Sequence, residues 1–104
     1  MSDYEKLRRE DARLVILAEL ARQRDTTLNS RNLAQVVESF VPRALPEWVE
    51  AQIEWLDSMG AVNMTRSDLP GLGAVVIATL TRTGRNHVER RAFIPGVSRP
   101  ADEE

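Results

Sequence analysis

Four carboxylates recur within a short stretch of this sequence, and no lysine or arginine lies between Ala44 and Gly60. A helix advances about 100° per residue, so in a helix these four side chains fall within an arc of roughly 80°. Such a row of charges is open to a hard cation, to a cationic partner or simply to solvent, although its linear spread suits a stripe better than a metal cage. This acidic stripe consists of Glu47, Glu50, Glu54 and Asp57.

The helix dipole favours acids in a first helical turn by about 0.3–1 kcal/mol each. This effect accounts for Glu47, and less well for Glu50, but not for the two later acids. Glu50 and Glu54 are also a like-charge pair four residues apart, which is unfavourable in a helix. A solvated face and a face for a cationic partner therefore both stay open.

Covalent and metal chemistry find little support in the composition. The chain has no cysteine and a single histidine, His87, which we expect to be a partly exposed helix residue. No nucleophile elbow and no phosphate-binding glycine loop is present. The sequence therefore predicts neither an enzyme nor a metal or other cofactor.

Positive charge gathers near the carboxyl end of the chain. The segment 82–99 carries five arginines and only one acid, Glu89, so its charge of +4 matches the −4 of the acidic stripe. The two could meet within one molecule or across a dimer, or the basic segment could contact DNA phosphate. The candidate nucleic-acid contacts are Arg66, Arg82, Arg85, Arg90 and Arg91.

Large apolar residues offer a second kind of recognition. Trp48 and Trp55 are seven residues apart, beside the expected core positions, and they suit either core packing or an anchor for a protein partner. Leu69 and Leu72 lie in a Pro/Gly-rich segment and suit an apolar contact. The predicted protein-interaction face therefore comprises the acidic stripe, both tryptophans and both leucines.

Hydrophobic periodicity and capping residues predict the elements that position these side chains. We expect Ser2 or Asp3 to cap the first helix, and Phe40 to face inward from the second. Asn29 should cap the second helix, and Thr81 or Thr83 the last. In the third helix, Val49, Ile53 and Leu56 are the expected core positions. The predicted helices end near Arg24, Phe40, Met59 and Ala92, and the second and third begin at Ser30 and Pro46. The predicted strands are 61–65 and 74–80, joined by the loop 67–73.

This order of elements is that of a winged helix-turn-helix. We predict an α+β, mostly helical fold with three helices, a two-stranded β-hairpin wing and a C-terminal helix. Residues 1–92 form this domain, with an N-terminal helical extension, and residues 93–104 form an extended or mobile tail. The acidic stripe then lies on the helix that would usually read DNA, where negative charge opposes phosphate contact.

Four pieces of the sequence, YEKLRREDARLVILAELA, IEWLDSMGAV, IATLTRTGRNHVERR and IPGVSRP, together resemble a known family. These are small winged-helix proteins of Mu-like bacteriophages and prophages, sometimes labelled ArsR-like regulators. The resemblance implies a winged-helix fold and a phage setting, and it implies no catalytic or ligand residues. The metal-sensing residues of ArsR regulators have no counterpart in this chain.

We therefore expect a non-enzymatic binding module of the bacterial cytoplasm. Its expected partner is a phage or host protein, or a second copy in a homodimer, bound through the acidic third helix. The alternative is a DNA-binding transcriptional regulator that contacts phosphate through the arginine-rich C-terminal segment. A charged start to the chain and an apolar run of only about five residues argue against a signal peptide or a membrane span.

Overall fold

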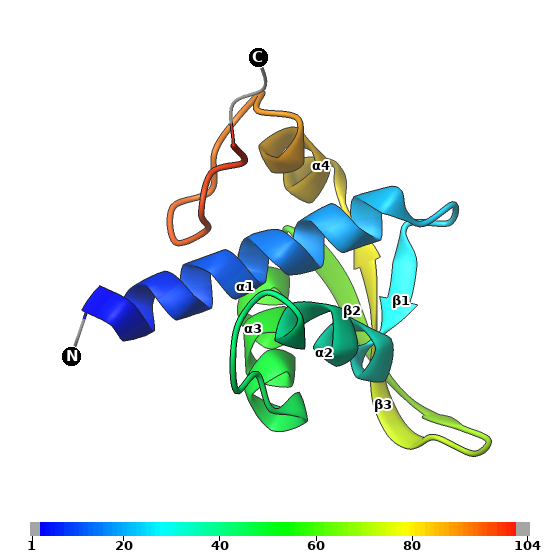
Figure 1. Cartoon of the computed structure of the whole chain (residues 1–104). Helices are drawn as coiled ribbons and strands as arrows, with labels where there is room; N and C mark the ends of the chain where they lie inside the picture. The colour runs from blue at the N-terminus through cyan, green and yellow to red at the C-terminus, as the bar shows by residue number, and fades with distance from the viewer. Residues whose placement is uncertain (1–2, 102–104) are drawn as a thin grey trace.

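A computed structural model describes residues 3–101, which form four helices and a three-stranded antiparallel sheet (Figure 1). Roughly half of the described chain is helical, and the predicted α+β class is confirmed. The helices are α1 (Asp3–Arg22), α2 (Ser30–Glu38), α3 (Pro46–Ser58) and α4 (Arg82–Val88). The strands are β1 (Thr27–Asn29), β2 (Val62–Leu69) and β3 (Gly73–Leu80).

The sheet has the strand order β1-β3-β2. Strands β2 and β3 pair without interruption from Val62↔Leu80 to Leu69↔Gly73, so the hairpin is longer than the sequence predicted. The polar stretch 66–68 lacks the apolar alternation of a strand, and its pairing with residues 74–76 of β3 is what keeps it extended.

Strand β1 was not predicted. It covers only three residues and pairs with the carboxyl-terminal half of β3, from Thr27↔Thr79 to Asn29↔Ile77. Asn29 also caps α2, because its side-chain oxygen accepts a hydrogen bond from the Asn32 amide at 2.9 Å. The predicted cap is therefore confirmed, and the same residue also ends a strand whose partner lies far away in the sequence.

Side chains satisfy amide groups at both edges of the sheet. On the β1 side of β3, the Ser30 hydroxyl accepts a hydrogen bond from the Val76 amide at 3.0 Å. On the outer edge of β2, the Asp57 carboxylate accepts one from the Met64 amide at 3.1 Å. These two bonds continue the sheet's hydrogen bonding where no neighbouring strand is present.

The core lies between the helices and one face of the sheet. Helix α1 is central, with α2 and α3 packed on one side and α4 on the other (Figure 1). The predicted core positions of α3 are confirmed, since Val49, Ile53 and Leu56 are fully buried. The other fully buried apolar residues are Ala12, Ile16, Leu17, Leu20, Leu33, Val37, Ala61 and Ala78.

Helices α1 and α2 end earlier than predicted. Helix α1 stops at Arg22, and α2 stops at Glu38, where the Ser39 hydroxyl donates to the Val36 carbonyl oxygen and Ser39 becomes the C-cap. Our expectation that Phe40 faces inward is wrong, because its side chain is 70% exposed. Beyond the helix the chain turns, and Phe40 no longer follows the helical period. Ser2, the alternative cap of the first helix, lies outside the described residues.

Helix α4 ends at Val88, not near Ala92. Arg90 adopts a left-handed conformation with φ of 62°, and the amides of Arg91 and Ala92 donate back to the Asn86 carbonyl oxygen. This arrangement terminates the helix and turns the chain towards α1.

Residues 93–101 of the predicted extended or mobile tail form no helix or strand. We call them the C-terminal strap, because they pack against α1. Ile94 and Val97 are buried and add to the core, and the Ser98 amide donates to the Glu10 carbonyl oxygen at 3.1 Å. Residues 102–104 of the predicted tail lie outside the described residues.

Candidate functional site

The acidic stripe lies on the solvent side of α3. Glu47, Glu54 and Asp57 are exposed and Glu50 is half-buried. Pro46 begins the helix, where its missing amide hydrogen costs no hydrogen bond. The opposite side of α3 packs into the core, so the helix must direct its carboxylates outward.

One arginine of the β2–β3 hairpin reaches the stripe. Arg66 of β2 forms an ion pair with Glu54, and its second terminal nitrogen lies 3.6 Å from a Glu50 carboxylate oxygen. Asp57 is engaged as well, through the Met64 amide. The sequence showed no cation within α3, and the structure supplies one from a strand that follows it. Exposed pairs of this kind contribute about 0–1 kcal/mol each, so the stripe keeps most of its negative character.

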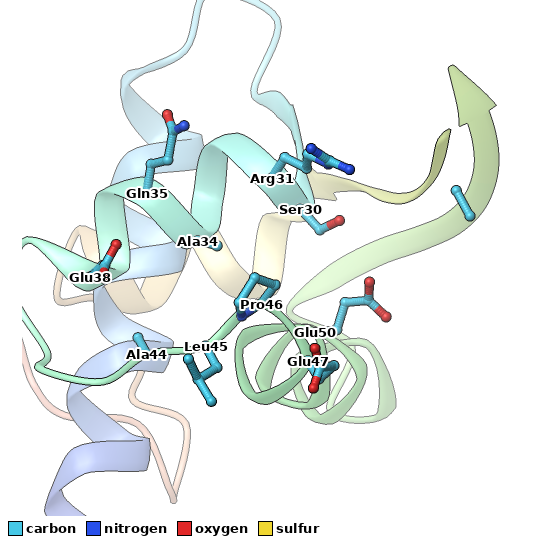
Figure 2. A pocket seen from close by; sticks show the side chains of 11 residues that line it. Ser30, Arg31, Ala34, Gln35, Glu38, Ala44, Leu45, Pro46, Glu47 and Glu50 are labelled. Atoms are coloured by element: carbon cyan, nitrogen blue, oxygen red, sulfur yellow. The ribbon is translucent and has the colours of Figure 1, made fainter. Parts of the chain in front are cut away.

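A groove runs beside the stripe, between α2 and α3, with a volume of ≈ 490 Å³. Glu47 and Glu50 border it on α3, while Arg31 and Glu38 stand at the two ends of α2 (Figure 2). The groove is therefore lined by three carboxylates and one guanidinium. We call it the acidic groove; it is lined by Ser30, Arg31, Ala34, Gln35, Glu38, Ala44, Leu45, Pro46, Glu47, Glu50 and Ala74.

The arginine-rich segment does not meet the acidic stripe. Arg85 and Arg91 both lie 3.4 Å from Glu89, and Arg90 donates to the Ala101 carbonyl oxygen. Helix α1 stands between α4 and α3 (Figure 1). Within the molecule, the cation that pairs with the stripe is Arg66. The expectation that the arginine-rich segment could pair with the stripe within one monomer is therefore wrong.

Arg82 is the most available cation of that segment. Its side chain is exposed, and among the described residues it makes no ion pair. Arg99 instead places its guanidinium 4.3 Å from the centre of the Phe93 ring within the C-terminal strap. The basic surface around α4 is therefore partly used in local contacts.

Both tryptophans contact arginines of α1. The Arg8 guanidinium lies 4.4 Å from the Trp48 ring centre, and that of Arg13 lies 3.8 Å from the Trp55 ring centre. Such stacking places a cation over the aromatic face. Both rings are half-buried and engaged within the molecule, so the packing interpretation of the tryptophans explains their position.

Arg13 has the features of a functional residue, and the sequence alone did not single it out. It is nearly buried, and it donates to the Gln52 side-chain oxygen and to the Gly96 carbonyl oxygen, both at 2.9 Å. Burial lowers the pKa of Arg13, the positive charge of Arg9 lowers it further, and Glu10 opposes the shift. Its position within the run of apolar residues in α1 was the only available signal.

His87 is not the partly exposed residue that we expected. It is fully buried, because the C-terminal strap covers it. Its Nδ1 accepts a hydrogen bond from the Ile94 amide at 3.0 Å, and its Nε2 lies 2.8 Å from the Ser98 carbonyl oxygen. A carbonyl can only accept, so these contacts fit the neutral ring with its hydrogen on Nε2. The histidine holds the strap and faces no pocket.

The two leucines near the hairpin turn are half-buried. Leu69 ends β2, and the Leu72 amide donates to its carbonyl oxygen across the turn at 3.0 Å. Neither leucine lines the acidic groove, although Ala74 of the adjoining strand does.

Neither a metal cluster nor a membrane span emerges in the part of the chain that the structure describes. Residues 3–101 hold no group of three or more potential metal ligands. No helix there has both the length and the apolar character needed to cross a membrane. A comparison with family models finds no match to this chain, and comparisons with curated proteins and with solved structures find none either.

Proposed function

We propose that the chain is a winged-helix module without enzymatic activity, and that its acidic groove binds a basic segment of a phage or host protein. The element order and the strand order β1-β3-β2 support the winged-helix assignment, with α2 and α3 as the helix-turn-helix and β2–β3 as the wing. The resemblance to Mu-like phage proteins supports the phage setting.

The observation that carries this proposal is the sign of the charge around the groove. Glu38, Glu47 and Glu50 line it, while Arg31 is its only basic residue. The wing contributes Arg66, which is already paired with α3. A DNA backbone would meet net repulsion here, whereas lysine and arginine side chains would meet the carboxylates of Glu38 and Glu47, which form no ion pair among the described residues.

Titration with a lysine- and arginine-rich peptide tests the proposal, with a sequence of the same length carrying serine at the basic positions as the control probe. Amide chemical shifts should change around the groove, at Ala34, Gln35 and Ala44. Glu38→Lys and Glu47→Lys should each weaken binding about tenfold, and salt should weaken it too. Asp25→Lys, outside the groove, should bind as the unmodified chain does. Equal binding by all variants, or none by the unmodified chain, would overturn the proposal.

Binding to DNA through the α4 end is the second candidate. Arg82 is exposed without an ion pair in the described chain, and Arg85 and Arg91 share the single carboxylate of Glu89. A duplex should then bind with an affinity that falls steeply with salt, and Arg82→Ala with Arg91→Ala should weaken it. A lack of binding at low salt would eliminate this candidate.

A further inference from the structure

Four large apolar side chains near one end of the molecule are more than half exposed. The exposed fractions are 63% for Tyr4, 54% for Leu7, 70% for Phe40 and 63% for Leu45. The other exposed large apolar residues among positions 3–101, Met59 and Phe93, reach only 40%.

These four residues are contiguous on the surface. Tyr4, Leu7 and Phe40 line one shallow hollow together with Pro42. Tyr4, Pro42 and Leu45 line the adjoining hollow. We call this surface the apolar patch; it consists of Tyr4, Leu7, Phe40, Pro42 and Leu45.

The patch is held in place and does not belong to a frayed helix end. Arg8 forms an ion pair with Glu5 on the same helix, and it donates to the carbonyl oxygens of Pro42 and Arg43 at 2.8 and 3.0 Å. Its guanidinium also lies over Trp48. Helix α1 and the α2–α3 connection therefore form one surface, and a contiguous exposed apolar surface usually marks an interaction site.

The charges around the apolar patch are of both signs. Asp3 and Lys6 are exposed on α1, and Arg43 is exposed on the α2–α3 connection. Such a rim selects neither a strongly basic nor a strongly acidic partner. It does suit a surface that meets itself across a two-fold axis, where each charge can face its opposite.

We propose that the apolar patch binds the same patch of a second copy of this chain. The amino-terminal half of α1 extends beyond the core (Figure 1), so two copies can lie antiparallel there. A two-fold axis between Tyr4 and Leu7 places Tyr4 of each copy against Leu7 of the other. Phe40 and Leu45, on the α2–α3 connection, would flank this contact.

The apolar area is sufficient for the smallest class of stable interface. An aromatic side chain buries about 150–250 Å² when covered, so the exposed parts of Tyr4 and Phe40 give on the order of 500 Å² over two copies. The leucines, Pro42 and the charged rim extend this area towards the roughly 1,200 Å² at which specific interfaces begin. The dimer should therefore be weak and depend on concentration.

This interface is separate from the acidic groove but adjoins it. Leu45 lines both surfaces. A dimer formed through the apolar patch would thus set two acidic grooves beside a shared interface. The proposal does not depend on what the grooves bind.

Sedimentation velocity over a wide range of concentration tests the dimer. The mass of the unmodified chain should rise from 11.7 kDa towards twice that value. Leu7→Glu and Phe40→Asp should each weaken association about tenfold or more, with unchanged circular dichroism, because these side chains are exposed. Met59→Glu replaces an exposed apolar residue outside the patch and should dimerise normally.

Two outcomes would overturn the proposal. One is a chain that stays monomeric at every concentration, and the other is a dimer that tolerates both Leu7→Glu and Phe40→Asp.

Discussion

Arg13 joins three parts of the molecule through a single side chain. It leaves α1, stacks on Trp55 of α3, and donates to Gln52 and to the Gly96 carbonyl oxygen of the C-terminal strap. Burying a guanidinium is costly unless its donors are satisfied, and here the surrounding groups satisfy them. The residue is therefore a structural centre and not a binding residue.

Replacing Arg13 with alanine should lower the free energy of unfolding by roughly 2–4 kcal/mol, because Gln52 and the Gly96 carbonyl lose a charged partner. Urea denaturation measures the change. Arg9→Ala, on the same helix and with no hydrogen bond to the strap, should cost well under about 1 kcal/mol. Equal effects of the two substitutions would contradict this role.

Gly96 allows the strap to approach the Trp55 ring. It has φ of 94°, and an added Cβ would lie 2.7 Å from two ring carbons. Gly71 in the turn between β2 and β3 has φ of 81°, and an added Cβ there would meet nothing within 4 Å. Both substitutions by alanine carry backbone strain, so Gly96→Ala should destabilise by about 1–3 kcal/mol more than Gly71→Ala. Because both variants carry backbone strain, the difference between their melting temperatures measures the clash with Trp55. Equal melting temperatures would exclude this clash.

Among the elements, those with strong local signals were predicted from the sequence. Helix α3 begins at Pro46 and buries the expected apolar side, and α2 begins after the Asn29 cap. Strand β1 and the strap lacked such signals, because three residues carry no period and residues 93–101 form no regular element. Their places depend on distant partners, β3 and α1, which a local pattern cannot reveal.

The candidate site was likewise predictable from the sequence only in part. The acidic stripe follows from helical spacing, so its outward face was predictable. The cation that pairs with it, Arg66, lies on β2, twelve residues after Glu54 in the sequence. This contact depends on how the β2–β3 hairpin packs against α3. The exposure of Phe40 depends on a helix end two residues earlier than predicted, which placed an apolar side chain in solvent.

The strap itself contributes to stability through its buried aliphatic residues. Ile94→Ala should lower the free energy of unfolding by about 2–4 kcal/mol, since the side chain is only 7% exposed. Pro95→Ala, on the exposed side of the same segment, should change it by less than about 1 kcal/mol. Guanidinium denaturation compares the two. Similar midpoints for both variants would indicate a strap that adds nothing to the core.

At the scale of the whole molecule, charge is separated although the net charge is only −2. The acidic stripe and groove lie at α3, and the basic surface lies at α4 on the far side of α1. The apolar patch, with charges of both signs around it, adjoins the acidic groove through Leu45. The molecule thus presents three chemically different surfaces, and each suits a different partner.

The hydrogen bond between the Ser30 hydroxyl and the Val76 amide has a consequence for solvent exchange. Val76 has no strand beside it at that edge, yet its amide hydrogen is bonded and buried. Its hydrogen should therefore exchange with deuterium as slowly as those of residues in the paired part of β3. Ser30→Ala should release it to much faster exchange, while Ser39→Ala should leave its rate unchanged. One hydroxyl at the start of α2 thus sets how far the protected region of the sheet extends into the β2–β3 hairpin.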